Sequence, residues 1–115
     1  MKKLKALAAL DALAQAHRLD IFRLLVEAGP DGLAAGAMSK RLRLAPNALT
    51  FHLDRLRDAR LITVHRDGRS MIYAARFDTM NGLLGYLTEN CCGGVTACTP
   101  AVACKPVRKR AKIPA

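Results

Sequence analysis

The residues of this sequence with the greatest capacity for chemistry are four cysteines in one short segment, Cys91, Cys92, Cys98 and Cys104. Disulfides that staple a small domain are usually spread through the core that they hold together. All four cysteines here instead follow the last strong hydrophobic pattern of the 115-residue chain. This distribution favours a metal site or a redox site over a structural disulfide framework.

Thiolates are soft ligands, and they select soft acceptors. Trivalent arsenic and antimony form three bonds in a pyramid, so three thiolates complete their coordination. Cys91, Cys92 and Cys98 could therefore converge on one such atom within one subunit. Cys104 would then be a fourth ligand, a substitute ligand or a bystander.

Other uses of these thiols stay open. Four thiolates also bind zinc, although structural zinc sites usually separate paired cysteines by about two to four residues, and Cys91 and Cys92 are adjacent. Cadmium or lead would accept three or four thiolates, a redox-sensing tail would form disulfides, and a metal chaperone or scavenger would use the same thiols. An enzyme is not expected, because no C-x-x-C follows a predicted strand and no catalytic His or Asp is near.

A second group of candidate residues lies on a predicted helix at 46–59. Leu49, Leu53 and Leu56 form one apolar stripe along it. Polar and aromatic side chains fall off this stripe, namely Asn47, Thr50, Phe51, Asp54 and Arg55. The amide of Asn47 can pair bidentately with adenine, and Arg55 could bind a phosphate.

The elements that must position these residues follow from the hydrophobic periodicity. Helices are predicted at 4–14, 16–28, 34–43, 46–59 and 78–90. The first carries a face of leucine and alanine. The second ends at Gly29-Pro30-Asp31-Gly32. Residues 43–45 form a tight turn before Pro46, which suits the first position of a helix.

After the fourth helix the period changes to that of strands. Residues 61–66 and 70–74 are β-prone, and Asp67-Gly68 between them is a strong hairpin signal. A short helix, a tight turn, a second helix and a basic hairpin make the layout of a winged helix-turn-helix. The fold is therefore predicted to be mainly α with a small β-hairpin. Its second helix would fit the major groove of DNA, and the hairpin would carry Arg66 and Arg69 to the neighbouring backbone or minor groove.

The charge of the chain supports a polyanionic partner. The net charge is +10, and residues 105–115 hold five Lys or Arg and no acid, which leaves half of that charge on residues 1–104. A basic surface favours nucleic acid, while ordinary solubility charge is the alternative.

We divide the chain into a DNA-binding and dimerisation domain at 1–90 and a cysteine-containing sensor segment with a basic tail at 91–115. The basic N-terminus imitates a signal peptide, but Asp11 interrupts its short apolar run, so a cytoplasmic protein is expected. No apolar stretch reaches about 18 residues, so no membrane span is expected.

Over about residues 4–90, the sequence resembles the ArsR/SmtB family of metal-responsive repressors. The segments that carry the resemblance are Leu13-Ala14…His17-Arg18-Leu19-Asp20-Ile21, Leu44…Thr50-Phe51-His52-Leu53…Leu56-Arg57-Asp58-Ala59-Arg60-Leu61-Ile62 and Arg66-Asp67-Gly68-Arg69…Tyr73. The hydroxyl–variable–His–Leu segment at 50–53 is the most specific. Arg60 departs from the pattern, because the family usually has Gly there and Gly adopts a left-handed conformation more cheaply.

The resemblance implies a homodimer, paired through the first and last helices, that binds a palindromic operator in double-stranded DNA. It assigns the recognition-helix positions to Asn47, Thr50 and His52 and the wing contacts to Arg66 and Arg69. His52 has an alternative role, which is to hold its helix against a neighbouring one.

The resemblance also bears on the sensor. Family members sense metals at different places, but residues 36–42 contain no Cys and residues 78–90 contain no His. What remains is the C-terminal cluster, similar to that of arsenic-responsive repressors with a paired Cys and a third one downstream. The expected function is repression that is relieved when As(III) or Sb(III) binds Cys91, Cys92 and Cys98, with no cofactor required. Methylated arsenite, which needs only two thiolates, stays open as the inducer.

Overall fold

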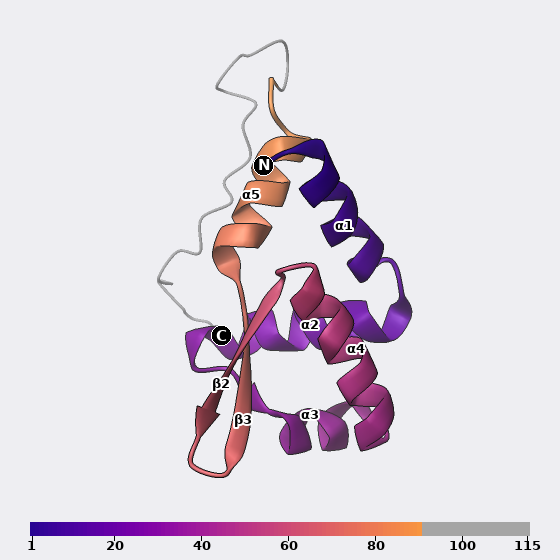
Figure 1. Ribbon diagram of the computed structural model, residues 1–115, viewed down its shortest axis with the longest axis vertical. Coiled ribbons are helices and arrows are strands. Elements are labelled where there is room, and N and C mark those ends of the chain that lie inside the picture. Colours follow the sequence, from indigo (N-terminus) through magenta and orange to yellow (C-terminus); the bar gives the residue numbers. More distant parts are fainter. Residues whose placement is uncertain (91–115) are drawn as a thin grey trace, which may run out of the picture.

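A computed structural model of the protein describes residues 1–90 (Figure 1). Its elements in chain order are α1 (Lys3–Leu13), α2 (Ala16–Ala28), the 3₁₀ turn η1 (Gly29–Asp31), β1 (Leu33–Ala34), α3 (Ala35–Leu42), α4 (Pro46–Asp58), β2 (Ile62–Asp67), β3 (Ser70–Ala75) and α5 (Phe77–Leu87). The predicted winged helix-turn-helix is confirmed. Within this part of the chain, no helix is both long and apolar enough to cross a membrane.

The sheet has one strand more than the predicted hairpin. Its order is β1-β3-β2, and both pairings are antiparallel. The extra strand, β1, has only two residues, Leu33 and Ala34, which pair with Tyr73 and Ile72. Just before it, Gly32 has a φ of +71°, and a Cβ there would overlap the carbonyl oxygen of Tyr73. Glycine is therefore required where the chain turns from η1 onto β3.

The core lies where α2 crosses the helix-turn-helix and the base of the hairpin. Its largest fully buried side chains come from α2, α3, α4 and the chain entering β2: Ile21, Leu25, Met38, Leu49, Leu53, Leu56, Leu61 and Ile62. The predicted stripe of α4 is thus buried. Burying these apolar side chains supplies the main stabilisation of so small a domain.

The first helix packs through its alanines. Ala6, Ala9 and Ala12 are buried, whereas Leu4 and Leu7 on the other side of α1 are exposed. The small alanine side chains let α1 lie close to the rest of the domain. Of the leucines on the predicted leucine/alanine face, Leu4, Leu7 and Leu10 are exposed in the single chain, and Leu13 packs partly against the core.

Two arginines adopt the left-handed conformation at helix ends. Arg60 follows α4 with a φ of +62°, the amide N–H of Leu61 donates to the carbonyl of Leu56, and that of Arg60 donates to the carbonyl of Arg57. These two bonds form a Schellman motif. The turn that the family usually makes with Gly therefore forms with Arg60. Arg43 ends α3 with a φ of +56°.

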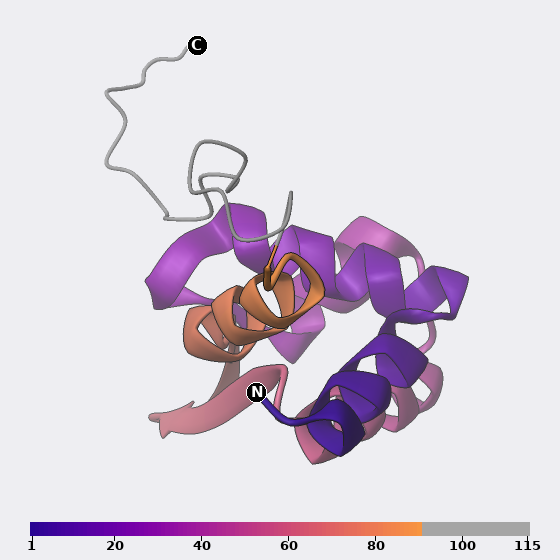
Figure 2. The ribbon, with the colours of Figure 1, turned by 90° about the horizontal axis from the view of Figure 1, so that it is seen from above.

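The helix-turn-helix turn with the hairpin tip and the α1–α5 pair lie at opposite ends of the molecule. In Figure 1 the tip of the β2–β3 hairpin and the turn between α3 and α4 lie at the lower end. α1 and α5 lie at the upper end, and Figure 2, which looks down from there, shows them as the helices nearest the viewer.

Candidate nucleic-acid interface

The turn between α3 and α4 is fixed by bonds within the helix-turn-helix. The Ser39 hydroxyl donates to the carbonyl oxygen of Leu44, and the Leu44 amide donates to the carbonyl of Ser39 at 3.1 Å. Pro46 then begins α4, where its missing N–H costs no helical hydrogen bond. The orientation of α4 relative to α3 is therefore set locally.

One side of α4 is buried and the other faces solvent. Leu49, His52, Leu53 and Leu56 are buried. The exposed side carries the residues Asn47, Thr50, Phe51, Asp54 and Arg55. Of the predicted DNA contacts on this helix, the structure brings Asn47, Thr50 and Arg55 together on one surface.

Asn47 and Thr50 lie in the first turns of α4 with part of their hydrogen-bonding capacity already used. The Thr50 hydroxyl donates to the carbonyl of Pro46 at 2.9 Å, so its oxygen remains an acceptor toward the outside. The Asn47 side-chain oxygen accepts the amide N–H of Ala48 at 3.0 Å, and its NH₂ group can still donate. An amide and a hydroxyl at the start of a helix are suited to base edges in a major groove.

The hairpin carries the other predicted contacts. Arg66 faces Met71 across the β2–β3 ladder, and Arg69 follows Gly68, whose φ of +65° makes the turn. Both arginines are exposed. The hairpin tip and the start of α4 lie at the same end of the molecule (Figure 1), so the hairpin adds two arginines to the end that carries the start of α4.

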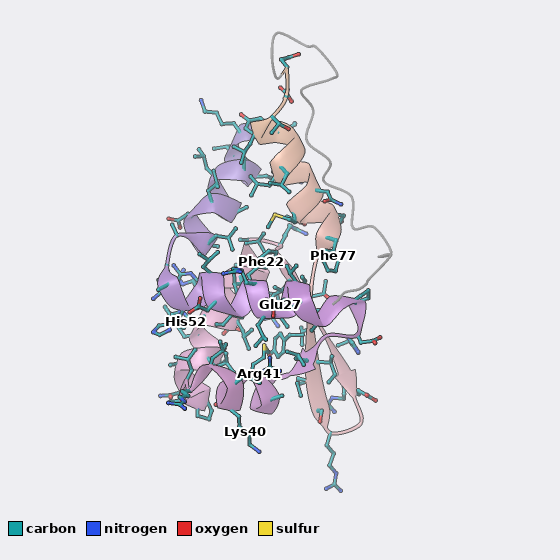
Figure 3. All side chains as sticks on the ribbon, turned by 180° about the vertical axis from the view of Figure 1, so that it is seen from behind. Phe22, Glu27, Lys40, Arg41, His52 and Phe77 are labelled. Atoms are coloured by element: carbon teal, nitrogen blue, oxygen red, sulfur yellow. The ribbon has the colours of Figure 1, made fainter. Side chains whose placement is uncertain are left out.

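Further cations lie on α3. Lys40 and Arg41 occupy its last turn. Figure 3 shows Lys40 extending away from the body at the end that carries the hairpin tip, with Arg41 on the side of α3 toward α2 and Glu27. This end therefore offers Lys40 as a further cation to a polyanion.

His52 lies apart from the other predicted contacts. It is 9% exposed, and Figure 3 shows it beside the start of α2. Its ring centroid is 5.5 Å from that of His17, and its Nδ1 atom finds no hydrogen-bond partner among residues 1–90. Burial, followed by the positive charges of Arg18 and His17, lowers the pKa of His52 below its ordinary value. Of the two roles open from the sequence, this position favours holding α4 against α2.

Phe51 was not among the predicted contact residues, yet it lies on the exposed side of α4. The Arg55 guanidinium carbon lies 5.2 Å from the centroid of its ring, within the range of a cation–π contact. The only signal in the sequence was that a large apolar residue falls off the apolar stripe.

The predicted metal ligands Cys91, Cys92, Cys98 and Cys104 lie outside the described residues. Within residues 1–90, no three His, Cys, Asp or Glu side chains are grouped so that they could hold a metal ion. The thiol site therefore rests on the sequence.

Comparisons with known proteins match this geometry. The family description "Helix-turn-helix domain" matches residues 13–65, from the end of α1 into β2. The HTH-type transcriptional regulator YgaV of Escherichia coli is 31% identical over 88 residues, which cover 76% of this chain and 87% of that protein. Nodulation protein NolR of Rhizobium meliloti is 32% identical over 80 residues, or 70% of this chain, and the match spans only 63% of NolR.

A solved structure shares the fold. The ArsR-like transcriptional regulator from Rhodococcus sp. RHA1 superposes with a TM-score of 0.66 at 24% identity, covering 73% of this chain and 76% of that one.

Proposed function

Because the chain belongs to the ArsR/SmtB family of helix-turn-helix transcriptional regulators, we propose that it is a homodimeric repressor of operator DNA that a soft, thiol-binding element releases. Family membership makes it a DNA-binding transcriptional regulator, and we propose that it has no enzymatic role. Repression, dimerisation and the identity of the inducer are proposed in addition to what membership of the family implies.

The proposed DNA binding rests on one observation, which is that the start of α4 and the tip of the hairpin lie at the same end of the molecule (Figure 1). Asn47 and Thr50 on α4 would contact base edges, and Arg66 and Arg69 on the hairpin would contact phosphates of the neighbouring backbone. Phosphate contacts supply most of the affinity, and base contacts supply the choice of sequence.

Exposed leucines at the opposite end support the dimer. Leu4, Leu7 and Leu87, on α1 and α5, are 81%, 52% and 54% exposed. α1 and α5 also contact each other within the chain. A second copy that covers this surface would bury the leucines and leave both reading helices free, as a two-fold symmetric operator requires.

The proposed inducer is trivalent arsenic or antimony bound by Cys91, Cys92 and Cys98. Cys91 is the fourth residue after the end of α5, and α5 is part of the proposed dimer surface. A ligand there would change how the two subunits, and so the two reading helices, are set relative to each other. Couplings of this kind typically change affinity by about 5- to 150-fold.

The experiment begins with a duplex that the fully reduced full-length protein selects from a randomised library. Fluorescence anisotropy then measures its affinity for this duplex with arsenite, antimonite, zinc or cadmium, for the wild type and for Cys→Ser variants at 91, 92, 98 and 104. We expect arsenite or antimonite to weaken binding, and Cys91→Ser, Cys92→Ser and Cys98→Ser to abolish that response.

Three results would contradict the proposal at different levels. A reduced protein that selects no duplex would contradict DNA binding. Release by zinc or cadmium but not by arsenite or antimonite would contradict the inducer. An unchanged arsenite response in the Cys91→Ser/Cys92→Ser double variant would contradict the site.

A further inference from the structure

We propose that Phe51 reads the 5-methyl group of a thymine in the operator, with Arg55 holding its ring in place. This inference rests on the proposed DNA binding by α4, and it adds a specificity-determining residue to that surface. Thymine is the base of unmodified DNA that carries such a methyl group, which it displays in the major groove.

The first step is the position of Phe51. It follows Asn47 by four residues on α4, so the two side chains are neighbours on one side of the helix. Its side chain is 52% exposed, whereas Phe22 on α2 is 3% exposed. The exposed half of an apolar ring on a polar, solvent-facing helix surface can gain further apolar contacts from a partner that approaches from outside.

The second step is that the ring is already oriented. Arg55 lies over the ring at 5.2 Å, and the ring of His52 meets it in an edge arrangement, with centroids 5.5 Å apart and planes at 67°. His52 is itself buried, so one contact of the Phe51 ring is anchored in the fold. A side chain held in this way loses little freedom on binding.

The third step is the chemistry of the complementary group. An aromatic ring cannot donate to or accept from a base edge as Asn47 can, so what it can detect is apolar surface. In the major groove that surface is the thymine methyl, and apolar side chains such as Phe contact it. The Arg55 guanidinium on the ring would remain beside the sugar-phosphate backbone, where its charge is favourable.

The test removes only the methyl group. In the duplex that the wild type selects, each thymine is replaced in turn by deoxyuridine, and affinities are measured for the wild type, Phe51→Ala and Phe51→Leu. We expect one thymine in each half-site at which the replacement weakens wild-type binding by about three- to tenfold, as loss of a buried methyl group implies. Phe51→Ala should show no weakening at that position, and Phe51→Leu should keep most of it.

Controls separate this effect from general damage. Leu19→Ala removes an apolar side chain on α2 that is 43% exposed, and it should keep the full sensitivity to deoxyuridine. Thermal melting should show all three variants to be folded, because both positions are exposed.

Three outcomes would overturn the inference alone. In the first, the wild type binds its duplex sequence-specifically but no thymine is sensitive to loss of its methyl. In the second, Phe51→Ala keeps the wild-type sensitivity to deoxyuridine. In the third, Phe51→Ala loses DNA binding only because it no longer dimerises, which would assign Phe51 to the contact between subunits. A wild type that selects no duplex would overturn the proposed function as well.

Discussion

The rings of His17 and His52 lie with their centroids 5.5 Å apart, which joins the first turn of α2 to the buried side of α4. His52 carries no partner for its Nδ1 among the described residues, and burial, Arg18 and His17 all lower its pKa. A proton on the His52 ring would place a poorly solvated positive charge beside the Arg18 guanidinium. The neutral ring is therefore the form that the fold holds.

We expect the free energy of unfolding to fall as the pH is lowered through the pKa of His52. The unfolded chain binds this proton at the ordinary pKa of about 6.5, and the folded protein only at lower pH. The free energy of unfolding is therefore unaffected by His52 above a pH of about 6.5. It falls below that pH, since the unfolded state then binds more protons than the folded state. Urea unfolding at pH 7.5 and 5.5 measures the loss.

The variant His52→Leu should flatten this dependence, and His17→Gln should retain most of it. A pH dependence of equal size in His52→Leu would assign the effect to a different group.

Replacing Arg60 by Gly should stabilise the protein. Arg60 holds a φ of +62° in the Schellman motif after α4, a conformation that costs a residue with a Cβ roughly 1–2 kcal/mol and glycine little. Because glycine also adds freedom to the unfolded chain, we expect a net gain of about 1 kcal/mol, or about 5 °C in melting temperature.

A matched control for this change is Arg57→Gly, within α4. Arg57 lies in the last turn of α4 with helical backbone angles, so glycine there should destabilise by up to about 1 kcal/mol, because glycine is a poor helix former. If Arg60→Gly instead destabilises the protein, the Arg60 side chain stabilises the fold by more than the backbone strain that glycine relieves.

Gly32→Ala should be far more damaging than Gly29→Ala. Both glycines have positive φ, of +71° and +77°, but a Cβ at Gly29 would meet nothing within 4 Å. Gly29→Ala therefore costs only backbone strain, about 1–3 kcal/mol, because a φ of +77° with a ψ of −164° is a conformation that essentially only glycine adopts. At Gly32 the Cβ would overlap the Tyr73 carbonyl oxygen, so β1 must separate from β3. Denaturant unfolding compares the two variants, and equal losses would contradict the close contact between Gly32 and Tyr73.

A charge on the exposed side of α1 should separate the proposed dimer. Leu4→Glu/Leu7→Glu places two carboxylates where a second copy would bury leucines, and glutamate is compatible with a helix. In analytical ultracentrifugation, we expect the wild type at twice the 12.5 kDa mass of the chain and the variant at that mass. Leu19→Glu, on α2, should remain a dimer. A wild type that sediments as a monomer would contradict the dimer itself.

The sequence predicted the fold where a repeating pattern and a local signal agree. Leu49, Leu53 and Leu56 recur along one side of α4, and all are buried. Asp67-Gly68 predicted the hairpin, and Gly68 takes the positive φ that such a turn needs. The two residues of β1 are too few to show any period, so that strand was missed.

What the sequence left undetermined depends on contacts between distant segments. Leucines and alanines both recur at helical spacing in α1, and only the packing of α1 on the domain decides that Ala6, Ala9 and Ala12 are inside. Likewise, the burial of His52 depends on α2 crossing α4. Phe51 was overlooked because an exposed aromatic on a DNA-reading helix has no sequence pattern of its own.

The most direct test of the central claim, that α4 and the hairpin together bind duplex DNA, is an NMR titration of the isotopically labelled full-length protein with its selected duplex. We expect backbone amide resonances of residues 43–55 and 65–70 to shift together, while those of residues 3–13 stay in place. Shifts confined to α1 and α5, or the absence of shifts at both α4 and the hairpin, would contradict it.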